Sequence, residues 1–185
     1  LLPFLTFIFL AFFGKKLSGI KAGIIGSLST GIITLVAGIM IFDYWGSHNG
    51  QGSQVLFHFP WLTFNEQLSI NMGLLIDPLS VMMVGVVTFV SFMVHLYSIE
   101  YLKGEDRYGS YFAYLSLFTF SMLGLVLSVN IFQMYVFWEL VGVSSFLLIG
   151  FYYQRPAAVA AAKKAFIVTR FADLGFLVGI LMLSF

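Results

Sequence analysis

The chain of 185 residues is 60% hydrophobic and 9% charged, whereas soluble domains average about 45–50% apolar and about 25% charged residues. A soluble core of this size could not bury so much apolar surface, which includes 22 phenylalanines, so the composition indicates a membrane protein. The net charge of +1 argues against a basic nucleic-acid-binding surface, and the lack of cysteine excludes disulfides and thiolate metal sites.

Apolar runs predict an all-α polytopic membrane protein of about six transmembrane helices. Most of these runs are close in length to the roughly 20 residues that an α-helix needs to cross a bilayer. The first run is too short to span alone and lacks a small-residue cleavage site, so we interpret it as a truncated helix rather than a signal peptide. The last run is still apolar at Phe185, and we expect a fragment cut at both ends. The expected helices cover residues 1–13, 22–42, 77–97, 111–129, 131–151 and 156–185.

A long loop is expected at 43–76, between the second and third helices. Aromatic and polar residues alternate in its part FHFPWLTFNEQLSINMGL, which predicts one or two short strands or an interfacial hairpin. Asp77 followed by Pro78 is typical of a helix N-cap and first helical position. The aromatic residues Tyr44, Trp45, Trp61 and Phe64 fit an interfacial belt.

The basic residues predict the orientation of the chain. Eight of the nine fall near alternate connections, and the other two connections contain none. By the positive-inside rule the basic connections face the cytoplasm or its equivalent, so the N-terminus and the long loop face outside. The eight are Lys15, Lys16, Lys21, Lys103, Arg107, Arg155, Lys163 and Lys164.

Charged residues within the fifth and sixth expected helices are the candidate functional groups. Glu139 lies in the apolar run VFWELVGVSS, and Arg170 and Asp173 lie three residues apart on one face of the sixth helix. Lys163 lies on that side one seven-residue step earlier. Counted from the same membrane side, Glu139 and Asp173 lie at similar depths of roughly 14–18 Å, where a charge is costly and is by default a functional hypothesis.

Each candidate has a structural alternative. Glu139 could simply join helices through a hydrogen bond, although Ser, Thr or Asn usually fill that role. Arg170 and Asp173 could neutralise one another, which would need no function. His95 could relay protons, but we interpret it as an interfacial histidine that reaches towards water. Asp77 is interpreted only as a cap. No metal-ligand cluster, phosphate-binding loop or nucleophilic triad is recognised.

Three stretches resemble a known family. They are GLLIDPLSVMMVGVVTFVSFMVHLYSIEYLKGEDRYGSYFAYLSLF at 73–118, VFWELVGVSSFLLIGFYY at 136–153 and AAAKKAFIVTRFADLGFLVG at 160–179. Their order and spacing resemble the N-terminal part of the largest antiporter-like membrane subunit of respiratory complex I, chain L or chain 5 of NADH:quinone oxidoreductase. The resemblance extends from about residue 70 to the end.

The resemblance implies roles for the motif residues. The glutamate of the family's WE-x-VG motif matches Glu139, on the proton-translocation path, and the aspartate of its TR-x-x-D motif matches Asp173, with Arg170 beside it. The family's lysine partner for that glutamate lies on a later helix, beyond this chain. The resemblance also divides the chain into 1–69, with two helices and the external loop; 70–130, with helices three and four; and 131–185, which begins the translocating core.

The function expected from the resemblance is a proton-translocating subunit of complex I. Its partners would be the other membrane subunits, the lipid bilayer and protons, without nucleic acid. NADH, FMN, iron–sulfur clusters and quinone would belong to partner subunits, with no cofactor or redox chemistry in this chain. A bacterial inner membrane is the expected location. The alternatives are a subunit of a multi-subunit sodium/proton antiporter or membrane-bound hydrogenase, and a passive membrane scaffold.

Overall fold

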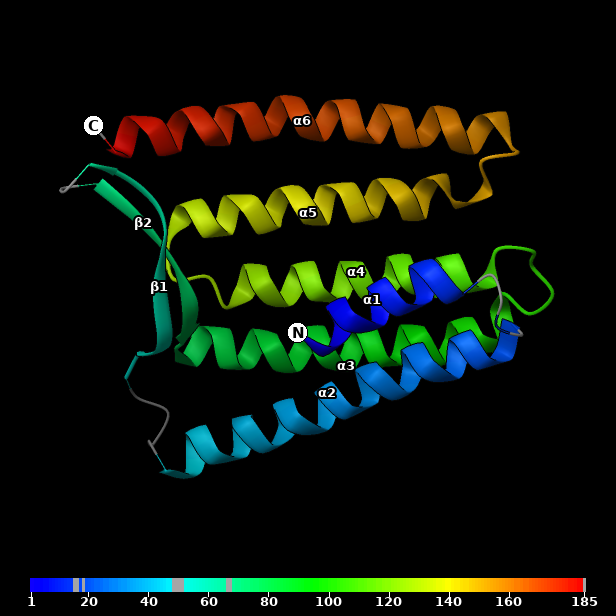
Figure 1. Cartoon of the computed structure of the whole chain (residues 1–185), viewed down its shortest axis with the longest axis horizontal. Coiled ribbons are helices and arrows are strands. Elements are labelled where there is room, and N and C mark those ends of the chain that lie inside the picture. Colours follow the sequence, from blue (N-terminus) through cyan, green and yellow to red (C-terminus); the bar gives the residue numbers. More distant parts are fainter. Residues whose placement is uncertain (15–16, 18, 48–51, 66–67, 185) are drawn as a thin grey trace.

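The computed structural model, described for all residues except 15–16, 18, 48–51, 66–67 and 185, is a layered bundle of α-helices with a β-hairpin across one end (Figure 1). Five of the helices in this described part are long and apolar enough to cross a membrane, and α1 is shorter. The predicted helical membrane architecture is confirmed. The elements are α1 Leu2–Phe13, α2 Gly19–Ser47, β1 Gln54–Asn65, β2 Leu68–Ile76, α3 Pro78–Tyr101, α4 Tyr108–Val126, α5 Ile131–Ile149, the 3₁₀ turn η1 Gly150–Tyr152 and α6 Pro156–Ser184.

Polar side chains at the helix starts explain where α3 and α5 begin. The Asp77 carboxylate accepts a hydrogen bond from the Ser80 backbone N–H at 2.6 Å, and the Ser80 hydroxyl accepts one from the Asp77 N–H at 2.8 Å. This reciprocal capping box, with Pro78 in the first turn, confirms the predicted cap. Asn130 caps α5 in a similar way, since its side chain accepts from Gln133 N at 2.8 Å.

Hydropathy alone misplaced several helix ends. The second helix continues to Ser47, so Tyr44 and Trp45 lie on α2 and the prediction that they belong to the loop was wrong. The third helix runs to Tyr101, and the fourth ends at Val126 rather than at residue 129. Helical hydrogen bonding can continue beyond an apolar run, as in α2 and α3, or stop before the run ends, as in α4, so the end of an apolar run is not the end of a helix.

The predicted hairpin is present and is longer than expected. Strands β1 and β2 pair antiparallel with register shifts along the ladder. The side-chain amide of Gln133 on α5 forms two hydrogen bonds with the backbone of Gly73 on β2. Its carbonyl oxygen accepts from Gly73 N at 3.0 Å, and its nitrogen donates to Gly73 O at 2.9 Å. The backbone of Leu75 also donates to Leu127 O at 3.0 Å. The hairpin is thus tied to the α4–α5 turn rather than free of the bundle.

The buried core lies where α1, α2 and α4 meet the ends of α3 and α5. Helix α1 crosses α4 so closely that a Cβ on Gly109 would lie 2.6 Å from the backbone oxygen of Gly14. Aromatic rings fill the space beside this crossing, with Tyr108 and Phe112 4.9 Å apart between ring centroids. The core residues are Leu10, Ala22, Leu102, Tyr108, Phe112, Ala113 and Phe151.

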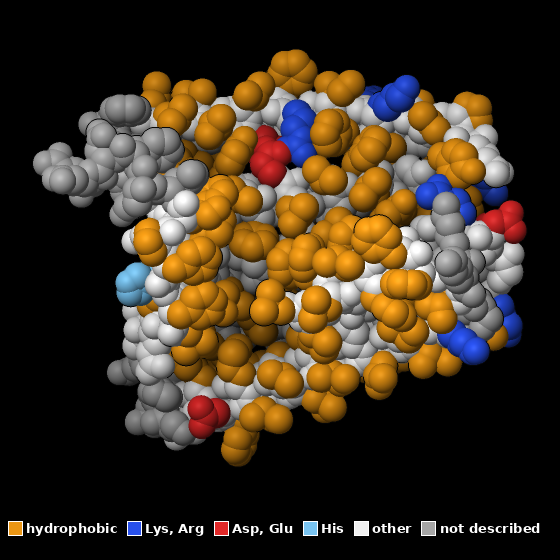
Figure 2. Space-filling view, in the orientation of Figure 1, with side chains coloured by type: hydrophobic (Ala, Val, Ile, Leu, Met, Phe, Trp, Pro, Cys, Tyr) orange, Lys and Arg blue, Asp and Glu red, His pale blue; other side chains and the backbone are white. Residues whose placement is uncertain are grey.

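The connections alternate between the two ends of the bundle. The connections α1–α2, α3–α4 and α5–α6 lie at one end, opposite the hairpin and the α4–α5 turn (Figure 1). Lys and Arg side chains gather mainly at the first of these ends in Figure 2. Two of the basic residues, Lys15 and Lys16, lie outside the described residues, and Lys163 and Lys164 lie within α6, near its start, as the expected helix at 156–185 implies. Which end faces the cytoplasm stays a prediction.

Candidate functional site

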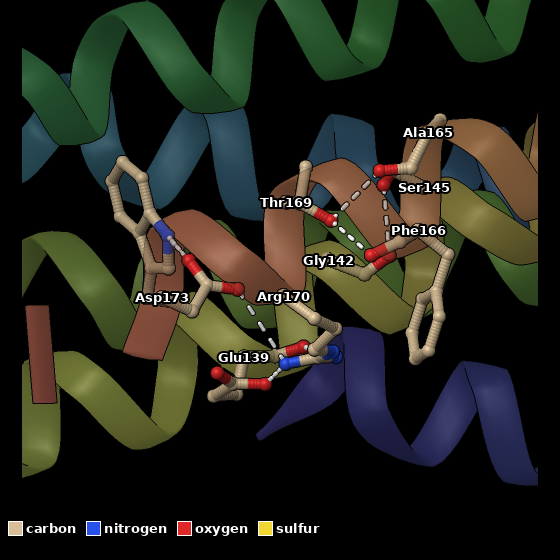
Figure 3. A network of polar contacts seen from close by, with 9 residues as sticks. Glu139, Gly142, Ser145, Ala165, Phe166, Thr169, Arg170 and Asp173 are labelled. Atoms are coloured by element: carbon tan, nitrogen blue, oxygen red, sulfur yellow. Dashed lines mark hydrogen bonds and ion pairs between the residues drawn. The ribbon is translucent and has the colours of Figure 1, made fainter. Parts of the chain in front are cut away.

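An ion pair between the two C-terminal helices forms the centre of the candidate site (Figure 3). Arg170 extends from α6 towards α5, where its Nη1 contacts Oε2 of Glu139 and its Nη2 donates to the Glu139 backbone oxygen at 3.3 Å. The guanidinium therefore binds both the side chain and the main chain of one residue. The two side chains are each 25% exposed, so the pair is partly shielded from the surroundings.

A second carboxylate meets the same guanidinium. Asp173, one turn along α6, places Oδ2 3.6 Å from Arg170 Nη1, and its side chain is only 7% exposed. Its other oxygen, Oδ1, accepts a hydrogen bond from the indole Nε1 of Trp138 on α5 at 2.9 Å. Because Trp138 and Glu139 are adjacent on α5, both Arg170 and Asp173 bind across the same helix contact.

Apolar and small residues shape the space around the guanidinium. The Cζ atom of Arg170 lies 4.6 Å from the ring centroid of Phe166, which is a cation–π distance. On the α5 side, a Cβ added to Gly142 would stand 3.6 Å from Arg170 Nη2, so the glycine lets the charged group lie against the helix backbone. Close approach through small residues is typical of membrane helix pairs.

The charge balance of this cluster is its main chemical property. Glu139 and Asp173 together with Arg170 comprise two acids and one base, so full ionisation leaves one negative charge. Figure 2 shows acidic and basic side chains together in an otherwise hydrophobic face over α5 and α6. An uncompensated charge in such a place costs several kcal/mol, of order 2.5–3.5 kcal/mol on insertion scales. The arrangement therefore places two acids and one base within a single helix contact.

The structure brings three of the four predicted site residues together but pairs them differently from the prediction. We expected Arg170 beside Asp173, and expected the cation for Glu139 to come from outside the chain. In the structure Arg170 contacts both carboxylates, so this chain itself supplies a cation to Glu139. Periodicity along one helix shows which residues share a face, but it contains no information about the residue opposite on another helix.

Lys163, the fourth predicted site residue, lies apart from the cluster. It is exposed, about 10 Å along α6 from Arg170 by the helical rise. It lines a shallow pocket with Arg107 and Tyr114 at the loop end of the bundle. Trp138 was not among the predicted site residues, although its indole N–H needs an acceptor when it faces a helix contact. An indole N–H that needs an acceptor, directly before a glutamate in the middle of an apolar helix, was the feature of the sequence that could have identified Trp138.

His95 contradicts its sequence interpretation. Instead of reaching towards water it is fully buried, with 0% exposure. Its Nδ1 hydrogen-bonds the Ser91 backbone oxygen at 2.8 Å, and its ring packs on Phe112. The interfacial reading failed because the residue faces α2 and α4 rather than the lipid. Among the described residues, no group of three or more His, Cys, Asp or Glu could hold a metal ion.

Comparisons with known proteins agree with this architecture. A family profile described as NADH-ubiquinone oxidoreductase (complex I), chain 5 N-terminus, matches residues 61–112. A second, described as NADH:quinone oxidoreductase/Mrp antiporter, transmembrane, matches residues 128–185 and includes the whole candidate cluster. Together the two profiles match more than half of the chain.

Curated relatives carry the same description. The chain is 45% identical to NAD(P)H-quinone oxidoreductase subunit 5, chloroplastic, of Chara vulgaris. The aligned 159 residues cover 86% of this chain. It is 44% identical over 172 residues, 93% of the chain, to the protein of that name from Angiopteris evecta. The chain spans 23% and 22% of the lengths of these relatives.

Two solved structures share the fold. The membrane-bound sulfane sulfur reductase, an archaeal respiratory membrane complex, matches with a TM-score of 0.77 and 21% identity over 96% of this chain and 34% of its own. The Mrp complex from Dietzia sp. DQ12-45-1b matches with a TM-score of 0.71 and 22% identity, and the match covers 96% of this chain and 18% of that chain. At this identity the two structures show the fold alone; the profile matches and the curated relatives show that the chain belongs to the antiporter-like family of chain 5 of NADH:quinone oxidoreductase.

Proposed function

We propose that the chain is part of a proton-translocating membrane subunit of NADH:quinone oxidoreductase, and that Glu139, Arg170 and Asp173 hold and release the transferred proton. The observation that carries the proposal is one guanidinium shared by two carboxylates from adjacent helices, within an apolar face. A purely structural pair would need one acid for one base. The additional acid supplies a group that can bind a proton without leaving an unpaired cation.

The proposed mechanism uses competition for Arg170. When both acids are ionised, the guanidinium stabilises both, and the net negative charge favours protonation of one of them. Protonation of Glu139 would weaken its attraction for Arg170 and leave the guanidinium to Asp173, which Trp138 also holds through a hydrogen bond. A neighbouring cation favours the ionised form of an acid, so displacement of the guanidinium changes which acid holds the proton.

The remaining chemistry of the complex is assigned to other subunits. We propose that the chain takes part in quinone reduction only as a subunit, with NADH, FMN, iron–sulfur clusters and quinone bound by its partners. Coupling would pass to this chain through neighbouring membrane subunits. The exposed apolar flanks of α5 and α6 fit contact with further helices or with lipid.

The proposed location is an energy-converting membrane, with the basic end of the bundle facing the cytoplasm or its equivalent. The curated relatives reported above are described as chloroplastic, and a bacterial inner membrane stays a prediction. A cysteine placed at Gly104, in the α3–α4 connection, should react with an impermeant reagent only from the cytoplasmic side. A cysteine at Gly52, before the hairpin, should react only from the other side. Reaction of both from one side would contradict the orientation.

A sodium/proton antiporter subunit is the second candidate. The observation that favours it is the fold shared with the Mrp complex, together with a family profile whose description includes the Mrp antiporter. The sequence prediction also considered a membrane-bound hydrogenase. Copurification separates these functions, because quinone-reductase subunits should accompany the full-length protein in one case and antiporter subunits in the other.

The test of the proton role is Glu139→Gln in the full-length subunit within its complex. Glutamine keeps the volume and the hydrogen-bonding capacity but cannot cycle between two protonation states. We expect near-normal assembly on a native gel, with a severe loss of pH-gradient formation in vesicles. Glu139→Asp should keep part of the pumping, because the acid remains at a shorter reach.

The matched control is Glu100→Gln, which removes an acid from the exposed Glu100–Lys103 pair at the loop end. It should leave pumping unchanged, since an exposed pair contributes little. Normal pumping by an assembled Glu139→Gln variant would show that Glu139 only joins the helices. A passive scaffold would then be the better description.

A further inference from the structure

A second buried polar site lies on the other side of α4 from the α5–α6 contact. His95 on α3 is 0% exposed, and its Nε2 atom has no hydrogen-bonding partner among the described residues. The ring is enclosed by α2 and α4: a Cβ on Gly26 would lie 3.2 Å from His95 Cδ2, and Phe112 lies 5.9 Å away between ring centroids. A buried nitrogen without a partner is costly, by about 1–3 kcal/mol.

The other nitrogen of the ring determines which tautomer is present. His95 Nδ1 lies 2.8 Å from the backbone oxygen of Ser91. A carbonyl oxygen only accepts hydrogen bonds, so Nδ1 must carry the hydrogen. In the neutral ring Nε2 is then a lone-pair acceptor, and it requires a donor.

Charged side chains do not supply that donor. The charged residues within the described parts of α2, α3 and α4 are Lys21, Asp43 and Glu100, all near helix ends. The titratable Tyr108 uses its hydroxyl to donate to Ile99 O at 3.0 Å. The imidazole is therefore surrounded by apolar and neutral polar groups, which favour its uncharged form.

A second buried polar atom without a hydrogen-bonding partner among the described residues lies on α2, the helix that packs against α3. Ser27 on α2 is 5% exposed, and its Oγ likewise has no partner among the described residues. One turn to either side on α2, a Cβ on Gly23 would meet Tyr108 of α4 and Ile99 of α3, and a Cβ on Gly31 would meet Phe92 of α3. Ser27 therefore lies level with the stretch of α3 between Phe92 and Ile99, which contains His95.

We propose that His95 and Ser27 form an internal hydration site, in which bound water joins His95 Nε2 and Ser27 Oγ between α2 and α3. Water suits both atoms, because it can donate to the imidazole lone pair and accept from or donate to the hydroxyl. Buried waters in proteins occupy such positions, where they satisfy polar groups that have no other partner.

The site gives the bundle a proton-accepting group separate from the Glu139 cluster. Because the surroundings favour the neutral ring, an excess proton on the bound water passes to Nε2 only transiently. The transfer leaves neutral water and an imidazolium that donates from both nitrogens, to Ser91 O and to the water. Both hydrogen bonds thus survive the transfer. This accepting role rests on the proposed translocation function, whereas the hydration site itself does not.

The hydration site can be tested by solid-state NMR of the intact complex in lipid, with ¹⁵N-labelled histidine. We expect His95 to show a protonated Nδ1, an unprotonated Nε2 and a cross-peak from Nε2 to water protons. Ser27→Ala should weaken or abolish that cross-peak. Ser29→Ala is the matched control, because Ser29 instead accepts a hydrogen bond from Thr6 at 2.7 Å, so it should leave the His95 signal unchanged.

Two results would overturn the site: an ordered His95 without a water cross-peak, or a direct hydrogen bond from Ser27 Oγ to Nε2. The accepting role is tested by pumping of the complex with His95→Gln, which should fall while quinone reduction continues. Should this variant fail to assemble, Ser27→Ala serves instead, with the same expectation. Normal pumping in an assembled variant would remove the accepting role. Failure of the Glu139 test would refute the proposed function but leave the NMR result standing.

Discussion

The α1–α4 bundle and the α5–α6 pair are stabilised by different means. Helices α1 to α4 enclose a core of close glycine contacts and of aromatic rings packed in tilted or edge-on pairs. Helices α5 and α6 contain few buried residues, and charged side chains join them at mid-length. Packing gives a rigid structure that responds little to protonation, whereas an ion cluster changes its interactions whenever one acid gains a proton.

This difference suggests that α1–α4 mainly stabilise the protein and that the α5–α6 cluster mainly serves transport. Changes in α1–α4 should affect stability and assembly before they affect transport, apart from the proposed His95 site. Changes in the α5–α6 cluster should affect transport first. The four predictions below test that separation, and each compares a variant with a control elsewhere in the chain.

The largest effect is expected from Arg170→Gln, because it leaves both carboxylates without their shared cation. We expect pumping to be lost and the free energy of unfolding to fall by about 3 kcal/mol, at the low end for a broken buried pair because the side chains are partly exposed. The exposed Arg155→Gln should have little effect. The double variant with Asp173→Asn should not restore pumping, since Glu139 stays unpaired. Full restoration would mean that Arg170 merely balances Asp173.

The next effect concerns packing in the first region. Gly109→Ala would force a methyl group against the Gly14 backbone, which cannot move aside as a side chain can. Overpacking of this kind costs about 2–3 kcal/mol, and thermal unfolding in detergent should show it. Gly38→Ala is the control, because nothing lies within 4 Å of its added Cβ. Reduced pumping per assembled complex in Gly109→Ala would break the proposed separation.

Gln133→Leu tests the attachment of the hairpin to α5. It removes both hydrogen bonds to Gly73, and we expect a loss of about 2 kcal/mol in the free energy of unfolding. Backbone hydrogen exchange should rise in β2 while the α1–α4 core stays protected. The exposed Gln154→Leu is the control. Unchanged exchange in β2 would show that strand pairing alone holds the hairpin.

The smallest effect is expected from Trp138→Phe, which removes the indole donor from Asp173 but keeps an aromatic ring. The lost hydrogen bond should cost about 1 kcal/mol of stability and lower the rate of pumping slightly. Trp45→Phe, on the exposed face of α2, should do neither. Stability and pumping equal to those of the unchanged protein would show that Trp138 does not influence Asp173.

Several features were predictable because they depend on local sequence. The helix starts at Pro78 and Ile131 follow from capping residues directly before them. The hairpin follows from alternating aromatic and polar residues. Glu139, Arg170 and Asp173 were identifiable because a charge within a long apolar run has few structural explanations. The helix ends were less predictable, since Ser47 and Tyr101 lie beyond the apolar runs.

By itself the sequence determined the membrane environment, the approximate helices and the presence of mid-membrane charges, since hydropathy and capping act over a few residues. Only the tertiary structure decided which side chains meet: Arg170 with Glu139, Trp138 with Asp173, and Gln133 with the hairpin. It likewise decided that His95 is buried rather than interfacial. The physical reason is that a residue's own helix fixes the direction of its side chain, but the packing of neighbouring helices fixes what that side chain contacts.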